Sequence, residues 1–537
     1  MRSLACLAFA AFAAAACPVL AAEADAVLLQ FKNGDSAREV GIVPPSADVD
    51  VSGPLALTVG DDGTIYVLDQ HNARVLAVSP ERAGLAPQVL TLPADTAAED
   101  LASVRNELFL WSDGVVRLEK TGHPDANERA LRFVTGGDVD TYTRSVFAAM
   151  GSQAPGPLND IVEAEGRSVA PDRERGPVIQ YVPSRGLGDI VAEVAVRDGR
   201  RVEVALRRGG EEFGFLMLAV SVRDPVGTVE VLDVDSTGRP FVLIETIPAG
   251  GGTAGTLIAR FAPDGTPDRL YEVPIDSGVA FSRRFVAVGP RGDLLFLKTT
   301  EARADVVRLA GRAIAPDESL SVARPIDVRP PKAKRPPKVA TRVTSREAVV
   351  ERAIAFETLR WRVDASAYGP DPAPRCPNMN RAQRPQYLNG KLGTEVKGVP
   401  YCWGCKTSPE AFEAGLDRGL TAGNVCTRSE IRKRVVGVDC SAFVSEVWGL
   451  KAHVTTAAMP AITRPLKNPW SLRPGDALNK PGAHVMLFLR FTADRKVEVM
   501  EASPNACAGR VCRNIYPLSV LLRRGYQPVT FSVIKSD

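Results

Sequence analysis

The sequence predicts a multidomain protein in which an all-β domain is followed by an α+β domain. The chain has 537 residues, which at about 100 to 200 residues per domain indicates at least two domains. Short strands separated by glycine-containing turns dominate residues 25–312, whereas helix and strand patterns mix in residues 344–537. The stretch between them is rich in proline and basic residues, which is typical of a linker.

Residues 1–22 have the pattern of a secretory signal peptide. A positive charge at Arg2 precedes an apolar run, which ends in Pro18 and small residues. This order predicts cleavage between Ala21 and Asp25 and export to the periplasm or the cell exterior. A membrane anchor is the alternative, which Pro18 and the alanine-rich composition disfavour. We expect no transmembrane segment in the mature chain, since no later segment is both long and apolar enough.

Charge and cysteine content narrow the class of protein further. With 66 basic and 63 acidic residues the net charge is +3, so no nucleic-acid partner is predicted. Of nine cysteines, two lie in the signal peptide, and an odd number remains for an oxidising compartment. This count predicts three disulfides and one free thiol, with the pairing left open. The remaining cysteines are Cys376, Cys402, Cys405, Cys426, Cys440, Cys507 and Cys512.

A zinc site is the alternative use of four of these cysteines. Cys402 with Cys405, and Cys507 with Cys512, have spacings that can close a tetrahedral site of four thiolates. Export favours disulfides over zinc. We therefore expect neither a metal nor a cofactor.

Residues 54–79 predict a β-hairpin with one buried face, because apolar and polar residues alternate on both sides of an Asp-Asp-Gly turn. Weaker copies of this pattern lie at 231–245 and 285–298. The first copy resembles an NHL-type propeller repeat in its turn and in the polar residues after it, which are Asp61, Asp62, Gly63, Tyr66, Asp69, Asn72 and Arg74. The resemblance implies a β-propeller over residues 25–312, with room for about six blades of about 40 to 45 residues each. A pair of β-sandwiches is the alternative.

This N-terminal domain shows no catalytic constellation. His71 and His123 are expected as surface turn residues, since neither lies in a cluster with metal-ligand spacing. We expect a binding or scaffolding role, with the ligand unknown. The linker is predicted at 313–343, and Thr344 with Glu347 then forms a capping-box pattern that opens the helix at the start of the second domain.

The segment GVDCSAFVSEVWGL, residues 437–450, predicts a helix with a cysteine in its first turn. Asp439 is a good N-cap, and an apolar stripe at helical spacing follows it. Cys440 would then face unsatisfied backbone N–H groups and the positive end of the helix dipole, which favour a thiolate. A nucleophilic cysteine also needs a base.

The second domain contains two histidines that could supply this base. His484 opens an apolar strand after the turn LRPGD, and a strand holds an imidazole rigidly. His453 lies in a predicted loop and is expected at the surface or as a local cap. The next strand, KVEVMEAS, brings Glu501 close to His484 if the two strands pair antiparallel. The result is nucleophile, base and orienting residue in the order Cys440, His484, Glu501.

The C-terminal part contains, in order, the blocks GVPYCWGC, GVDCSAFVSEVW, LRPGD, AHVMLFL and VMEAS. Together, over roughly residues 346–537, they resemble the NlpC-type peptidases, a papain-like family of cell-wall hydrolases. The resemblance implies a papain-like α+β domain in which Cys440 is the nucleophile, His484 is the base and Glu501 takes the third position. It also implies that Tyr401 lies beside the catalytic cysteine.

The sequence departs from the family pattern at three places. Cys405 replaces a usual glycine, Ala442 replaces another, and an insertion over about 406–434 separates the tyrosine block from the cysteine block. These departures bear on the substrate more than on the nucleophile.

The sequence therefore predicts an exported cysteine hydrolase that cleaves amide bonds in peptidoglycan stem peptides. Cys440 would form an acyl-enzyme, with the oxyanion stabilised by the Cys440 backbone N–H and by Tyr401. Two alternatives stay open. One is an amidase or acyltransferase of the same fold that acts on another polymer or a lipid, and the other is a propeller-based binding protein with an inactive second domain.

Overall fold

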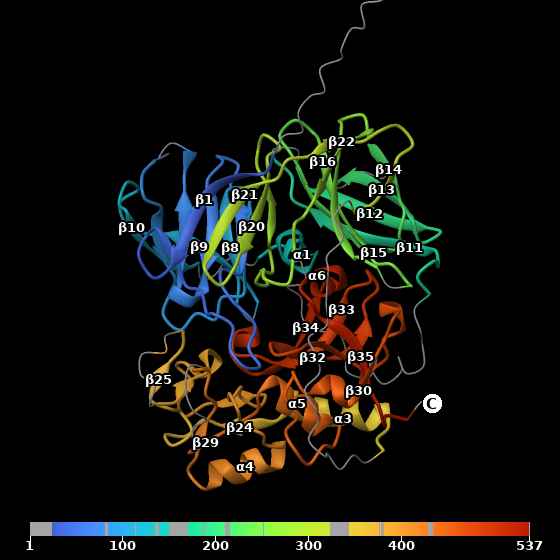
Figure 1. The fold of residues 1–537 in the computed structure, drawn as a ribbon. Helices are drawn as coiled ribbons and strands as arrows, with labels where there is room; N and C mark the ends of the chain where they lie inside the picture. The colour runs from blue at the N-terminus through green and yellow to red at the C-terminus, as the bar shows by residue number, and fades with distance from the viewer. Residues whose placement is uncertain are drawn as a thin grey trace, which may run out of the picture.

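The computed structural model describes residues 24–535, apart from 81–83, 113, 135–138, 150–169, 186–187, 210–214, 251, 323–342, 375, 377–380 and 428–432. The predicted signal peptide, and the linker from residue 323 onward, lie outside the described residues. A group of β-sheets from the N-terminal half packs on a smaller unit of sheet and helices from the C-terminal half (Figure 1). No helix among the described residues is long and apolar enough to cross a membrane.

The N-terminal half is a β-propeller in which runs of four consecutive antiparallel strands form the blades, and the last strands of the first two blades also pair in parallel, which joins these blades into one eight-stranded sheet. The first blade has β3 (Ala56–Val59), β4 (Ile65–Asp69), β5 (Arg74–Val78) and β6 (Gln88–Thr91), and the second has β7 (Asp100–Val104), β8 (Glu107–Trp111), β9 (Val115–Lys120) and β10 (Glu128–Phe133). The third has β11 (Arg175–Val182), β12 (Ile190–Arg197), β13 (Arg201–Arg208) and β14 (Leu216–Val222), and the fourth has β15 (Val226–Val234), β16 (Pro240–Thr246), β17 (Gly255–Phe261) and β18 (Pro267–Glu272).

The last blade closes the ring with a strand from the start of the chain. It joins β19 (Val286–Val288), β20 (Leu294–Thr299) and β21 (Arg303–Arg308) to β1 (Ala26–Asn33), with β2 (Glu39–Val40) at its edge. β1 pairs antiparallel with β21, so the two ends of the domain are held in one sheet. The described part of the chain thus contains five blades rather than six, and the sandwich alternative is wrong.

Buried and partly exposed side chains alternate along these strands, so that one face of each blade packs against a neighbouring blade. In β12, Ile190, Ala192, Val194 and Val196 are buried while the residues between them are partly exposed. A short helix, α1 (Thr141–Ala149), lies beside the inner strands of the second and third blades, where the Tyr142 hydroxyl donates to the backbone oxygen of Val182.

The propeller extends beyond the boundary predicted at residue 312. β22 (Arg312–Ala313) pairs with β18, and β23 (Ser319–Leu320) pairs with β14. The first residues assigned to the linker therefore add short strands to the outer edges of two blades, because an edge strand offers free backbone groups for pairing.

The C-terminal unit is built on one six-stranded sheet with helices on both faces. The sheet order is β30 (Thr463–Pro465), β35 (Gln527–Phe531), β31 (Ala477–Lys480), β32 (His484–Phe491), β33 (Val497–Ala502) and β34 (Val511–Tyr516). Its helices are α3 (Arg346–Thr358), α4 (Pro409–Asp417), α5 (Cys440–Val447) and α6 (Leu518–Arg523). Short elements fill the remainder: β24 (Arg360–Arg362), β25 (Asp371–Pro372), β26 (Gln383–Arg384), β27 (Glu395–Lys397), β28 (Thr421–Ala422), β29 (Val435–Val436), η3 (Gln386–Leu388), η4 (Met459–Ala461), η5 (Pro469–Ser471) and η6 (Ala506–Ala508).

Helix α5 is held in the centre of this unit by aromatic packing and by its caps. Phe443 of α5 meets Phe356 of α3 edge to face at 5.3 Å, and Trp448 stacks on Phe531 of the sheet at 4.9 Å. The N-cap of α3 is Ser345, whose hydroxyl accepts from the Ala348 N–H at 3.2 Å. The N-cap is therefore one residue after the predicted Thr344, whose hydroxyl accepts from Arg352 instead, and the predicted pairing of Thr344 with Glu347 in a capping box is not formed.

The two halves share a buried interface in which α6 faces the propeller (Figure 1). The Ser519 N–H donates to the Glu245 carboxylate at 3.1 Å, and Arg523 and Arg524 donate to propeller backbone oxygens at 3.0 Å each. Trp470, which is fully buried, donates to the backbone oxygen of Ile247 at 3.1 Å. Each of these buried polar groups has a hydrogen-bond partner in the other half. The bonds therefore hold the propeller in one position on the C-terminal unit.

The cysteines form disulfides rather than a zinc site. Cys376 pairs with Cys426, Cys402 pairs with Cys405, and Cys512 is also disulfide-bonded. Within the described chain no group of histidine, cysteine and carboxylate side chains is arranged to hold a metal ion. The alternative of a four-cysteine zinc site is wrong because Cys402 and Cys405 are bonded to each other. Cys440 is the free cysteine among the residues that the structure describes.

Candidate active site

The free thiol of Cys440 lies at the start of α5, as predicted. Asp439 caps the helix, and its carboxylate accepts from the Ala442 N–H at 2.7 Å. The backbone N–H groups of Ser441 and Val485 are directed at the sulfur. Val485 follows His484 at the start of β32, so the Cys440 sulfur lies against the end of the strand that carries the base candidate.

His484 and Glu501 form a buried pair on neighbouring strands. Nε2 of His484 lies 2.7 Å from Oε2 of Glu501, which is the proximity that the β32–β33 hairpin predicts. The other oxygen of Glu501 accepts from Asn514 Nδ2 at 2.9 Å and from the Tyr516 hydroxyl. Since Nε2 is engaged by Glu501, Nδ1 is the ring nitrogen that remains for a proton from a nucleophile.

These contacts keep Glu501 ionised. Burial raises the pKa of Glu501, but the hydrogen bond and charge of His484, together with the donors Tyr516 and Asn514, lower that pKa by more. A charged carboxylate at this position stabilises the protonated imidazole that a general base becomes.

Tyr401 lies beside Cys440, where the sequence placed it. Its side chain is fully buried, and its hydroxyl has no hydrogen-bond partner within the described part of the chain. Burial first, and then the nearby charges of Cys440, Asp439 and Asp48, raise the pKa of Tyr401 well above its usual value. A neutral hydroxyl without a partner is available to donate to a group that enters the site.

The thiol itself differs from the predicted thiolate. Burial, followed by the negative charges of Asp439 and Asp48, raises the pKa of Cys440 well above its usual value, and the two backbone N–H groups offset this only in part. The sulfur is fully buried and donates a hydrogen bond to the backbone oxygen of Asp48 at 3.2 Å. In this arrangement Cys440 is a covered, neutral thiol.

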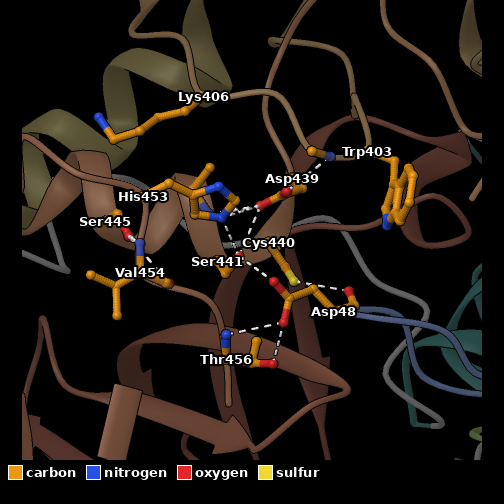
Figure 2. A network of polar contacts seen from close by, with 12 residues as sticks. Asp48, Trp403, Lys406, Asp439, Cys440, Ser441, Ser445, His453, Val454 and Thr456 are labelled. Carbon is orange, nitrogen blue, oxygen red and sulfur yellow. Dashed lines mark hydrogen bonds and ion pairs between the residues drawn. The ribbon is translucent and has the colours of Figure 1, made fainter. Parts of the chain in front are cut away.

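Asp48, a residue of the propeller half, supplies the cover (Figure 2). Its carboxylate accepts from the Ser441 hydroxyl at 2.8 Å and from the Thr456 N–H at 3.0 Å, and the Thr456 hydroxyl donates to it as well. Sequence reasoning missed Asp48. The segment PPSADVD that contains it indicates only a loop. One acidic residue on each side of Val49 is a feature of this loop, but it does not show what the carboxylates contact.

His453, expected at the surface or as a local cap, is partly exposed and lies beside the N-cap residue of α5. It lies in the same network, with Nε2 at 2.6 Å from the Ser441 hydroxyl and 3.4 Å from the Asp439 carboxylate (Figure 2). Among the other two predicted surface histidines, His123 is exposed, whereas His71 is partly buried and lies 3.0 Å from the hydroxyl of Ser52. A loop position gave no signal for these contacts, because a loop has no side-chain periodicity that would show which way the imidazole points.

Two cavities flank Val49, the residue that follows Asp48. One of about 90 Å³ is lined by His484 and Glu501 together with Asp50. A larger one of about 540 Å³ lies between the propeller and the C-terminal unit and reaches Cys426. Val49 lines both, so the segment that follows Asp48 stands between them.

No family model matches the chain, and no curated protein matches it. Solved structures with partial likeness include a streptogramin B lyase, at 13% identity over 48% of this chain and 65% of that chain with a TM-score of 0.17. They also include virginiamycin B lyase from Staphylococcus aureus, at 12% identity over 48% and 67% with a TM-score of 0.17. A third, described as a gluconolactonase, has 14% identity over 55% and 95% with a TM-score of 0.22. The chain thus spans slightly less than two thirds of the first of these, and the propeller assignment rests on the strand pairing above.

Proposed function

We propose that this protein is an exported cysteine hydrolase that cleaves amide bonds in peptidoglycan stem peptides. The proposal is supported by two observations: the Val485 N–H at the start of β32 is directed at the sulfur of Cys440 in the first turn of α5, and the preceding residue, His484, is paired to Glu501 at 2.7 Å. A cysteine helix packed on an antiparallel sheet that carries the histidine supports a papain-like assignment for the C-terminal unit. The disulfides are compatible with an oxidising compartment.

The chemistry follows from the roles that these groups can take. Nδ1 of His484 accepts the thiol proton, and the Cys440 sulfur attacks the carbonyl carbon of the substrate amide. The Cys440 backbone N–H and the Tyr401 hydroxyl donate to the resulting oxyanion. His484 returns the proton to the leaving amine, and a water then hydrolyses the acyl-enzyme, while Glu501 holds the imidazole in place.

The substrate class comes from the resemblance of the five sequence blocks to NlpC-type cell-wall hydrolases. We expect the mature protein to release stem-peptide fragments from purified peptidoglycan, identified by mass spectrometry, and Cys440→Ala to release none. His484→Ala lacks the general base, so its rate of fragment release should be at least about 100-fold lower than that of the unaltered protein. His123→Ala is the matched control, since His123 is exposed on the propeller and should leave the rate unchanged.

Two other results would contradict this proposal, one for the nucleophile and one for the substrate. Equal release by the unaltered protein and by Cys440→Ala would show that Cys440 is not the nucleophile. Release from no wall type, by a protein whose Cys440 is shown to be reactive, would favour the amidase or acyltransferase alternative on another polymer or lipid.

The covered thiol favours one further candidate. A propeller-based binding protein with an inactive hydrolase domain would also carry a buried, neutral Cys440. Such a protein would keep its binding partner in Cys440→Ala and show no thiol reactivity in any variant.

A further inference from the structure

The segment over Cys440 is a tight turn at the end of a short hairpin that projects from the propeller. Val43 forms a bridge with Ser52, and Ser46 forms another with Val49, whose backbone groups exchange hydrogen bonds of 3.0 and 3.1 Å. Ala47 and Asp48 are the tip. Asp48 has φ 58°, a left-handed conformation that aspartate tolerates better than most residues.

The backbone of this tip contacts the candidate nucleophile and a neighbouring indole. The Trp403 indole N–H donates to the backbone oxygen of Ala47 at 3.0 Å, and the Cys440 thiol donates to that of Asp48 at 3.2 Å. The oxygen of the Asp48 carbonyl, rather than its carbon, faces the sulfur. The peptide is therefore held but is not placed for attack.

The Asp48 carboxylate lies among fixed donors, one of which, the Ser441 hydroxyl, also lies 3.0 Å from the Asp439 carboxylate and 2.6 Å from Nε2 of His453. Ser441 and Thr456, both fully buried, supply its hydrogen bonds at 2.8 and 3.0 Å, and the Thr456 hydroxyl adds another. Thr456 is itself fixed, because its hydroxyl accepts from the Gly482 N–H at 2.9 Å and its carbonyl from Asn479 at 3.2 Å. Hydrogen bonds to an ionised oxygen are about twice as strong as neutral ones, so these donors select a carboxylate.

The carboxylate of Asp50 and contacts with the rest of the propeller hold the turn in position. Asp50 pairs with Lys480 at 2.9 Å and with Arg524 at 2.7 Å. On the propeller side, His71 lies 3.0 Å from Ser52, and Asp69 accepts from the Gly41 N–H at 2.9 Å. The turn is thus clamped at both ends and at its tip.

We propose that the pocket of Ser441 and Thr456 is a subsite for a carboxylate of the substrate, and that the chain's own turn, residues 46–49, occupies it and keeps the site closed. The inference rests on the proposed function of Cys440. Substrate and turn then compete for the same donors, so the apparent affinity for substrate falls in proportion to the fraction of molecules whose turn is displaced.

The first test measures access to the thiol and needs no substrate. The native, unreduced protein is treated with iodoacetamide, and modification of Cys440 is followed by peptide mass spectrometry. Asp48→Gly keeps the left-handed conformation and removes the carboxylate, so we expect modification to accelerate by about 10- to 100-fold, the range for loss of charge-assisted hydrogen bonds. Asp48→Asn should give a smaller acceleration.

Asp198→Gly is the matched control. Asp198 also has a positive φ of 50° but lies in an exposed turn of the propeller, and its variant should react at the rate of the unaltered protein. Unaltered protein that reacts as fast as N-acetylcysteine, or an Asp48→Gly variant that reacts no faster than unaltered protein, would overturn the closed state.

The second test concerns the subsite and uses the opened Asp48→Gly protein. N-acetyl-aspartate N-methylamide at millimolar concentration should slow alkylation of Cys440, and the asparagine analogue should not. Equal effects of the two compounds, or no effect of either, would overturn the carboxylate subsite. A protein that opens and binds the carboxylate but releases no peptidoglycan fragments would leave this inference standing and refute the proposed substrate.

Discussion

At the scale of single residues, His453 makes the closure of the site dependent on pH. Burial lowers the pKa of His453, but the hydrogen bond and charge of Asp439 and the charge of Asp48 raise it by more, and Lys406 opposes them weakly, so the net pKa lies above the usual value. Asp439 belongs to the C-terminal unit, so the charge of Asp48 is what links this shift to the turn. The contribution of Asp48 stabilises the closed network below the unfolded value of about 6.5 and is lost as pH rises through the folded pKa.

We therefore predict that the turn opens more readily as pH rises through and above neutrality. Hydrogen exchange of residues 43–52, corrected for its intrinsic pH dependence, should accelerate across this range in the unaltered protein, whereas His453→Gln should exchange fast at all these pH values. His123→Gln, at an exposed position, serves as the control. Protection that grows with pH in the unaltered protein would contradict the sign of this linkage.

Also at the residue scale, the sequence predicted the groups whose signals are local. Asp439 and Cys440 follow from capping and helical spacing, and Glu501 follows from the period of two neighbouring strands. Asp48 could not be found in this way, since its bond to Cys440 joins residues 392 positions apart. The neutral thiol was missed for the same reason, because the cover and one of the charges that raise the pKa of Cys440 come from that distant residue.

At the scale of elements, the start of α5 combines a helix cap with the electrostatics of the thiol. Asp439 accepts from the Ala442 N–H at 2.7 Å and from the Gly404 N–H at 3.0 Å, while its charge raises the pKa of Cys440 after the larger effect of burial. Asn caps helices as well as Asp, so Asp439→Asn should keep most of the stability, whereas Asp439→Ala should lose about 0.5–2 kcal/mol.

Both substitutions remove a negative charge and should lower the thiol pKa. Denaturant unfolding and ultraviolet titration of the thiolate separate the two effects. Ser408→Ala removes the N-cap of α4 and should destabilise the protein without moving the thiol pKa. An unchanged thiol pKa in Asp439→Asn would exclude the electrostatic role.

The number of blades could not be predicted from the sequence, although the propeller itself could. Strand patterns in residues 25–312 predicted a propeller, but the number of blades depends on how strands are shared between them. β1, from the start of the chain, completes the last blade by pairing with β21, and β22 and β23 add to the edges of earlier ones. Such pairings join distant segments through backbone groups, which carry no side-chain pattern to read in the sequence.

At the scale of the whole molecule, the question is whether the site opens by movement of the turn or by separation of the two halves. The interface between the halves is a continuous apolar cluster that includes Ile247 and Ala254 of the propeller with Trp470 and Leu521 of the C-terminal unit. Burial of large apolar side chains makes its separation costly, and truncation of a buried tryptophan costs about 3–5 kcal/mol. The turn, by contrast, is held by polar contacts of Asp48 and Asp50 and by the burial of Val49, so it has less apolar surface to expose than the interface.

We therefore predict that opening is confined to the turn. In Asp48→Gly the alkylation of Cys440 should accelerate while the radius of gyration from small-angle scattering stays that of the unaltered protein. In Trp470→Ala, which weakens the interface, the unfolding midpoint should fall, and any gain in alkylation should come with an increase in the radius. Expansion of Asp48→Gly would instead show that the propeller must move away as a body before Cys440 can meet a substrate, so that the propeller itself, and whatever it binds, would set the access to the thiol.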